Sequence, residues 1–182
     1  MSTNCCSDRK GVTLWFTGLP CSGKSAIADR VANILKDKGY YAERLDGDIV
    51  RQDLTRDLGF SKKDRDENIR RVTFVAKLLT RNGVIVLTSF ISPYREMRDR
   101  ARTQIGSFLE IYVKCPVEVC AERDVKGMYK KAMRGEIKEF TGVSDPYEEP
   151  EKPELLIESD KETLEHSVGR VLAKLGELGF IE

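Results

Sequence analysis

The stretch Gly18-Leu19-Pro20-Cys21-Ser22-Gly23-Lys24-Ser25 decides the fold of this chain. It follows an apolar run from Val12 to Phe16 and precedes an amphipathic pattern that starts near Ser25. A Gly-x-x-x-x-Gly-Lys-Ser spacing between a strand and a helix is typical of a phosphate-binding P-loop. The alternative is a chance match in a glycine-containing turn, and the flanking strand and helix argue against it. The stretch therefore predicts a site for a nucleoside triphosphate.

Each residue type in this loop has a chemical reason to be there. Gly18 and Gly23 allow backbone angles and close approaches that a Cβ would forbid. Unsatisfied N–H groups at the start of the following helix can donate to phosphate oxygens. Lys24 offers a positive charge to the β- and γ-phosphates, and Ser25 offers a hydroxyl to Mg²⁺.

The composition fits one domain with no strong overall charge. The 182 residues carry 31 Lys and Arg against 30 Asp and Glu, so no global field would recruit nucleic acid or an anionic membrane. No apolar run approaches the roughly 20 residues of a membrane helix, and Met1 to Lys10 lacks the apolar core of a signal peptide. We expect a cytoplasmic protein with an N-terminal tail over residues 1–10 and a single P-loop domain over residues 11–182.

The five cysteines are odd in number and include no C-x-x-C pair, and the chain has one histidine, so a Cys/His zinc site is not expected. Cys115 and Cys120 flank apolar positions, which favours small buried residues. Cys5 and Cys6 lie in the tail. A redox link from the tail to Cys21 is left open.

Strand and helix patterns alternate along the rest of the chain. The apolar patterns predict strands over residues 12–16, 41–45, 84–87, 108–113 and 155–157, and helices over 26–38, 61–83, 92–104, 116–123 and 161–178, with a brief helical turn from Ile49. The alternation predicts an α/β fold, a P-loop NTPase-type parallel sheet flanked by helices, with ligands at the carboxyl ends of the strands. Residues 124–153 are rich in glycine, proline and charge, and we expect them to form a mobile lid.

Two carboxylates follow the second expected strand, in Asp46-Gly47-Asp48. They can face the P-loop, where one would lie near the metal or its waters and the other would accept the proton of an attacking hydroxyl. A simple Asx turn is the alternative reading of this stretch taken alone.

The next polar segment contains Arg51, Phe60, Arg65 and Asn68. Phe60 stands where a core needs no aromatic ring, and Arg65 and Asn68 are three apart on one helix face. A ring, arginines and an amide suit a purine nucleotide with extra negative charge, since stacking contributes about 1–3 kcal/mol per base and a charged hydrogen bond about 1.5–3 kcal/mol.

An ordered set of motifs resembles the adenylylsulfate kinase (APS kinase) family. The set comprises the P-loop, Leu45-Asp-Gly-Asp-Ile-Val-Arg51, Asp57-Leu-Gly-Phe60, Asp66-Glu-Asn-Ile-Arg-Arg71, Thr88-Ser-Phe-Ile-Ser-Pro-Tyr94 and Lys138-Glu-Phe-Thr-Gly142, and the resemblance runs from about Lys10 to Leu156. It implies transfer of a phosphoryl group from MgATP to the 3′-hydroxyl of adenosine 5′-phosphosulfate (APS), as in sulfate assimilation. It also implies a homodimer and allows functional coupling to ATP sulfurylase.

The resemblance also implies a role for each matching residue. The ATP phosphates would be held by Gly18, Cys21, Ser22, Gly23, Lys24, Ser25 and Ala26. APS would be bound by Asp48, Arg51, Phe60, Arg65, Asn68, Ile91, Ser92, Lys126 and Phe140. Within this set Asp48 would lie nearest the reacting hydroxyl, Phe60 and Phe140 would sandwich the adenine, and Lys126 would reach over the site. Lys24, Asp46 and Asp48 are the residues expected to act in catalysis.

Ser92 matches a position that descriptions of the family label a phosphoserine intermediate. We expect direct transfer instead, because a serine nucleophile would need its own base and no histidine is available. Ser92 directly precedes Pro93, and this order favours the N-cap of the following helix. Ile49 departs from the family, many members of which have Asn there; this affects fine substrate contacts only.

Two other functions remain open from the sequence. One is a P-loop kinase for another small molecule, a nucleotide or a sugar acid. The other is a nucleotide switch or a non-catalytic assembly domain, against which stand the intact Lys24, Ser25 and Asp48 and the absence of an Asn-Lys-x-Asp sequence for guanine.

Overall fold

The structure, a computed structural model, describes residues 10–182. Cys5 and Cys6 lie outside this range, and with them the redox link to Cys21 that the sequence left open. Within the described range no helix is both long enough and apolar enough to cross a membrane.

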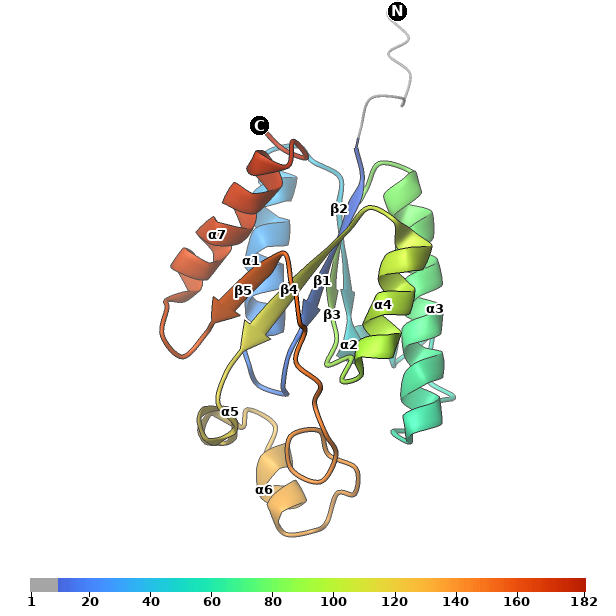
Figure 1. Cartoon of the computed structure of the whole chain (residues 1–182), viewed down its shortest axis with the longest axis vertical. Coiled ribbons are helices and arrows are strands. Elements are labelled where there is room, and N and C mark those ends of the chain that lie inside the picture. The colour runs from blue at the N-terminus through green and yellow to red at the C-terminus, as the bar shows by residue number, and fades with distance from the viewer. Residues whose placement is uncertain (1–9) are drawn as a thin grey trace, which may run out of the picture.

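Five strands form one parallel sheet in the order β2-β3-β1-β4-β5 (Figure 1). The strands are β1 (Val12–Thr17), β2 (Ala42–Asp46), β3 (Ile85–Ser89), β4 (Phe108–Lys114) and β5 (Leu155–Glu158). β1 is central, with Leu14 opposite Leu87 on one side and Leu109 on the other. All residues of β1 and β3 are buried, as expected for parallel strands covered on both faces. The predicted parallel sheet is confirmed.

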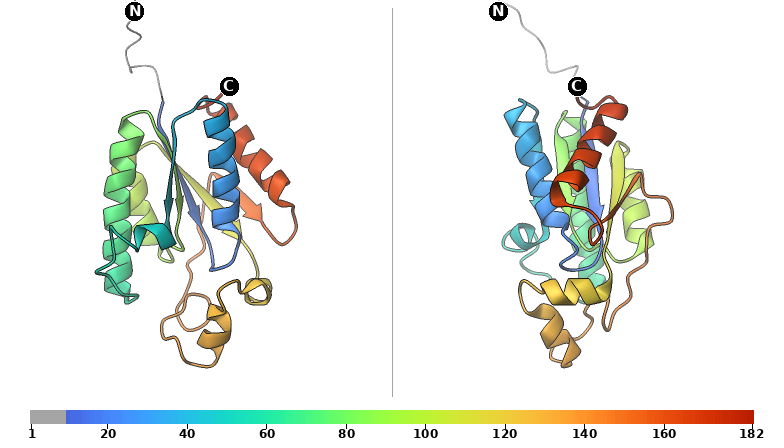
Figure 2. Two further views of the ribbon diagram at one scale, coloured as in Figure 1. Left: turned by 180° about the vertical axis from the view of Figure 1, so that it is seen from behind. Right: turned by 90° about the vertical axis from the view of Figure 1, so that its left-hand side faces the viewer.

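Helices cover both faces of this sheet. The helices of the described residues are α1 (Lys24–Asp37), α2 (Gly47–Val50), α3 (Lys62–Arg81), α4 (Arg95–Ile105), α5 (Val117–Arg123), α6 (Met128–Met133) and α7 (Leu164–Glu177). Figure 2 shows α1 and α7 on one face and α3 and α4 on the other. Ile27 and Val31 of α1 belong to the core on the first face, and Trp15, Ile69 and Met97 belong to the core on the second.

Most predicted elements are confirmed within a few residues, but the helix expected from Ser92 begins later. The structure places its start at Arg95 and its N-cap at Tyr94, so the predicted capping role of Ser92 is wrong. Ser92 has a positive φ of 40° and is buried, with its hydroxyl bonded inside the protein. An N-cap residue has extended backbone angles and a side-chain oxygen free to accept from the first turn, whereas Ser92 has a positive φ and its hydroxyl is bonded to Trp15 and Thr17.

The segment 124–153 contains a helix, α6, that the sequence pattern does not reveal. The carboxylate of Asp124 accepts hydrogen bonds from the N–H groups of Tyr129 and Lys130 and so satisfies donors in the first turn. Tyr129 and Phe140 pack with Cys115, Cys120 and Ala132 in a small apolar cluster, here called the lid core. The segment is thus anchored to the body of the protein through Cys115 and Cys120. Figure 1 shows the segment beyond the carboxyl ends of the strands.

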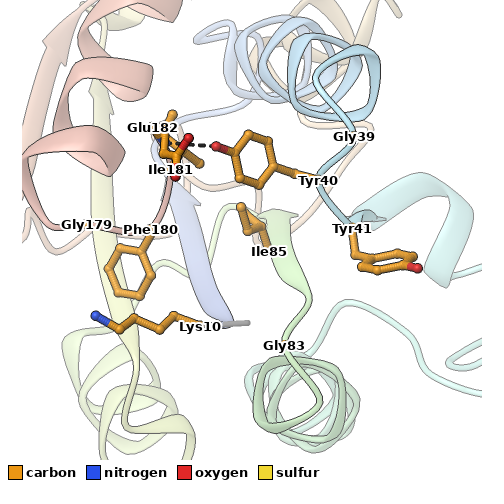
Figure 3. A pocket seen from close by; sticks show the side chains of 10 residues that line it. All are labelled: Lys10, Gly39, Tyr40, Tyr41, Gly83, Ile85, Gly179, Phe180, Ile181 and Glu182. Carbon is orange, nitrogen blue, oxygen red and sulfur yellow. Dashed lines mark hydrogen bonds between the residues drawn. The ribbon is translucent and has the colours of Figure 1, made fainter. Parts of the chain in front are cut away.

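A cavity opens at the opposite end of the sheet, before the strands begin (Figure 3). Lys10, Tyr40 and Phe180 are among the residues that line it, and the hydroxyl of Tyr40 accepts a hydrogen bond from the backbone N–H of Glu182 at 2.8 Å. The cavity lies at the amino ends of parallel strands, whereas ligands of such sheets bind at the carboxyl ends. It is therefore not part of the site described next.

Candidate active site

The P-loop connects β1 to α1 and wraps around the side chain of Lys24. The ammonium of Lys24 donates to the carbonyls of Gly18 (3.0 Å) and Leu19 (2.6 Å), and the side chain is almost wholly buried. This burial lowers the pKa of Lys24 to about 8. An anion beside this ammonium would favour its charged form, so the loop is suited to bind phosphate.

Two glycines give the loop its shape. Gly18 has a φ of 149°, and a Cβ added there would lie 2.3 Å from the carbonyl oxygen of Val113. Gly23 has a φ of 96° and is the N-cap of α1, with no side-chain oxygen over the first N–H groups. Because those N–H groups have no cap, they remain available to phosphate oxygens. Cys21 lies in the same loop with a φ of 60°, and Ser22 is buried beside it.

The two acids after β2 lie beside the start of α1. The hydroxyl of Ser25 donates to Asp46 at 2.7 Å. Asp46 also caps α2 by accepting from the N–H of Asp48 at 3.0 Å, and it pairs with Arg44 at 3.1 Å. The Asx-turn reading is thus correct for Asp46, and the same carboxylate also meets the P-loop serine.

This pair of oxygen donors fits Mg²⁺. Mg²⁺ prefers hard oxygen ligands and usually keeps several waters, held by one or two protein groups together with substrate phosphates. Among residues 10–182 there is no cluster of three or more Asp, Glu, His or Cys side chains able to hold a metal. Ser25 and Asp46 would therefore need phosphate and water to complete the shell, as in other nucleotide sites.

Lys126 reaches from the lid segment to Asp48, and the two side chains form an ion pair. Both side chains are more than half exposed, so the pair is accessible to solvent and contributes little to stability. The contact puts a lid residue directly on the acid expected near the reacting hydroxyl.

Arg51 and Phe60 lie together on the surface next to α3. The guanidinium of Arg51 stacks 4.4 Å from the centroid of the Phe60 ring and donates to the carbonyl of Gly59 at 3.1 Å. The ring of Phe60 is 61% exposed, which confirms that it serves no core. Burial, and then the charge of Arg65, lowers the pKa of Arg51.

Arg65 binds the lid segment in this structure. It donates to the carbonyls of Phe60 (2.8 Å) and Glu139 and to the hydroxyl of Thr141, and it pairs with Asp145 at 3.4 Å. The sequence did not reveal Thr141 and Asp145 as its partners. Arg65 therefore joins α3 to the lid segment at the place where APS was expected.

Asn68 is the next inward-facing residue of α3, and it is only 4% exposed. Its Oδ1 is buried and has no hydrogen-bond partner among the described residues. A buried acceptor without a donor costs about 1–3 kcal/mol, so it is suited to a ligand that brings a donor.

Phe140 lies in the lid core, where its ring packs edge-on against Tyr129 with centroids 4.9 Å apart. The side chain is 8% exposed, in contrast to Phe60. An adenine between Phe60 and Phe140 therefore stays a prediction, because this structure gives Phe140 another aromatic neighbour.

Ile91 and Ser92 follow β3 and are tied to the end of β1. The hydroxyl of Ser92 accepts from Trp15 Nε1 at 3.0 Å and donates to Thr17 at 3.1 Å. Thr17 in turn donates to the carbonyl of Ile91 at 2.7 Å, and its hydroxyl lies 2.9 Å from that of Tyr147. Sequence reasoning missed Thr17 and Tyr147; the only hint is a polar residue at the end of an apolar strand.

The model of the family described as adenylylsulphate kinase matches residues 10–158. The chain belongs to this family. It is 62% identical over 174 residues to an adenylyl-sulfate kinase of Halothermothrix orenii, which covers 96% of this chain and 94% of the relative. This similarity decides against another small-molecule kinase and against a nucleotide switch or assembly domain. This adenylylsulfate kinase family member is thus an enzyme that phosphorylates APS with ATP.

Two solved structures of APS kinases match the fold. The Mycobacterium tuberculosis APS kinase in complex with AMPPNP and APS is 42% identical with a TM-score of 0.89, over 92% of this chain and 99% of that chain. A hexameric APS kinase from Thiobacillus denitrificans is 35% identical with a TM-score of 0.74, over 96% of this chain and 30% of that chain.

Proposed function

We propose that this enzyme transfers the γ-phosphoryl group of MgATP to the 3′-hydroxyl of APS at the carboxyl edge of the sheet, with ATP on the P-loop side and APS between α3 and the lid segment. The observation that carries the proposal is the hydrogen bond from Ser25 to Asp46, because it joins the phosphate-binding loop to the stretch that contains Asp48.

On the donor side, the ATP phosphates would be held by the loop from Gly18 to Ala26. Lys24 stabilises charge that develops on the transferred group, and such fixed cations contribute several kcal/mol in a site that excludes water. Mg²⁺ would be held by the Ser25 hydroxyl with Asp46 near its waters, and it would supply charge neutralisation on the β- and γ-phosphates.

On the acceptor side, Asp48 would accept the proton of the 3′-hydroxyl. Its ion pair with Lys126 supports this position, since the lysine can leave the carboxylate for the anionic substrate. Phe60 and Arg51 would hold the adenine and the phosphosulfate, and Asn68 would accept a hydrogen bond from one of the donors that APS carries, the ribose hydroxyls and the adenine amino group.

The proposal routes the phosphoryl group directly to APS rather than through Ser92. Ser92 is 2% exposed and its hydroxyl is already bonded to Trp15 and Thr17, which supports a structural role. Ile91 and Ser92 would then contribute to APS binding through the position of their loop.

The enzyme would also have partners that follow from its substrate. APS must come from an adenylyl transfer from ATP to sulfate, so functional coupling to an ATP sulfurylase belongs to the proposal, as does a homodimer in the cytoplasm. Sedimentation of the purified chain at several concentrations tests the homodimer.

A coupled assay for ADP release tests the proposed reaction. The acceptors are APS, AMP, adenosine, shikimate and gluconate, each with ATP and Mg²⁺. We expect turnover with APS and with none of the other acceptors. Phosphorus NMR should show that the product carries the new phosphate on the 3′-oxygen. Faster turnover with any other acceptor would refute the substrate assignment.

A further inference from the structure

Arg98 is a charged side chain in the protein interior, and the chemistry described so far does not use it. It lies on α4 and is 2% exposed. Its Nε donates to Glu110 of β4 at 2.7 Å, and its two terminal nitrogens donate to the carbonyls of Ser92 and Glu148, each at 2.6 Å. A guanidinium is a rigid planar fork, so these three bonds fix three chain segments relative to one another.

Two of these segments belong to the acceptor side of the site. Ser92 is in the loop after β3, here called the acceptor loop, to which we assign APS contacts. Glu148 is in the part of the lid segment that returns to the sheet, residues 145–149, here called the return segment. The N–H of Glu148 donates to the carbonyl of Pro93 at 2.8 Å, and Asp145, the first residue of the return segment, pairs with Arg65. Arg98 therefore bonds both the loop that contains Ser92 and the return segment, whose first residue pairs with Arg65.

The same segments connect to the strand that leads into the P-loop. Tyr147 of the return segment shares a hydrogen bond with Thr17, which also accepts from Ser92. Thr17 directly precedes Gly18, and the guanidinium of Arg98 lies 5.7 Å from the centroid of the Tyr147 ring. Hydrogen bonds through Thr17 thus connect the acceptor loop and the return segment to the strand that leads into the P-loop.

Stability alone does not account for an ion pair at this place. Replacing both members of a buried ion pair with apolar side chains is often neutral or stabilising. What apolar side chains cannot replace are the two bonds from Arg98 to the carbonyls of Ser92 and Glu148.

We propose that Arg98 is a positioning residue for the acceptor substrate, acting through the acceptor loop and the return segment. This inference rests on the proposed function, since it concerns how APS is held. Arg98 touches no substrate itself, and it affects the binding of APS rather than of ATP.

The test is the double variant Arg98→Met/Glu110→Met, which removes the fork without leaving an unpaired buried charge. We expect KM for APS to rise and kcat/KM for APS to fall with it by up to roughly 100-fold, the loss that a misplacement of about 1 Å can cause, while KM for ATP is unchanged. Amide hydrogen exchange at residues 145–149 should become faster. The single variant Arg98→Lys, which keeps Glu110, should lose less than the double variant, because an ammonium can still pair with Glu110 but cannot make all three bonds.

Arg102→Met is the matched control. Arg102 lies one turn further along α4 and pairs with Glu110 and Glu154, but it bonds neither loop carbonyl. It should leave KM for APS unchanged. A folded double variant with the wild-type KM for APS, or an equal rise in KM for both substrates, would overturn the positioning role. If the double variant does not fold, the same comparison in Arg98→Lys decides. Failure of the wild-type enzyme to use APS would instead refute the proposed function.

Discussion

Replacing Asn68 with leucine separates the stability of this enzyme from its affinity for APS. In the free protein the buried Oδ1 of Asn68 has no hydrogen-bond partner among residues 10–182, and such a group costs about 1–3 kcal/mol. Leucine has nearly the same shape and removes that cost, so the midpoint of thermal unfolding should stay the same or rise. If APS supplies the missing donor, the variant loses that hydrogen bond. A loss of about 1–3 kcal/mol corresponds to a roughly 5- to 150-fold weaker affinity.

Isothermal calorimetry with APS in the presence of ADP and Mg²⁺ measures the affinity, and calorimetric unfolding of the free protein measures the stability. Thr73→Val is the control, because Thr73 is a buried residue of the same helix whose hydroxyl bonds back to the carbonyl of Ile69. It should leave APS binding unchanged. Unchanged APS affinity in Asn68→Leu would refute the reasoning, and so would a large loss of stability, since the acceptor would then be satisfied in the free protein.

Four further outcomes follow from the site. Lys24→Ala should abolish turnover in a folded protein, and an active variant would contradict the P-loop role. Because the pKa of Lys24 is lowered to about 8 and ATP favours its charged form, kcat/KM for ATP should fall as the pH rises above about 8; a flat profile there would contradict this. Phe60→Ala should weaken APS by about 1–3 kcal/mol and spare ATP in calorimetry, since it removes one face of the expected stack. Ser92→Ala should keep substantial activity, and rapid-quench detection of a labelled enzyme that forms and decays at the rate of turnover would contradict direct transfer.

The sheet and the donor half of the site could be predicted because their signals are local. The apolar runs of β1 and β3 and the spacing of the P-loop each lie within a few consecutive residues. That Asp46 faces the P-loop also follows, since β1 and β2 end at the same edge of one parallel sheet, with β3 between them.

The rest depends on contacts between distant residues, which no local pattern records. Arg98 stands in an arginine-rich helix whose sequence gives no sign of burial, and its partners Glu110 and Glu148 become visible only in the folded chain. The lid core was missed for the same reason: the burial of Cys120 was expected, but Phe140 is a single apolar residue in charged surroundings, and nothing local records that the two pack together. Ser92 was misassigned because the Ser-Pro order resembles a helix start, whereas Trp15 and Thr17 fix its hydroxyl.

The indole of Trp15 gives this enzyme a built-in optical reporter. It is the only tryptophan in the sequence, it is wholly buried between Phe90 and Phe108, and its N–H bonds directly to the Ser92 hydroxyl. Emission excited selectively at the red edge of the absorption band therefore comes from one fluorophore that touches the acceptor loop. A rearrangement of that loop would change the polarity around the indole and the hydrogen bond to its N–H. Shifts of the emission spectrum in stopped-flow mixing can therefore follow the acceptor loop in real time without any attached dye.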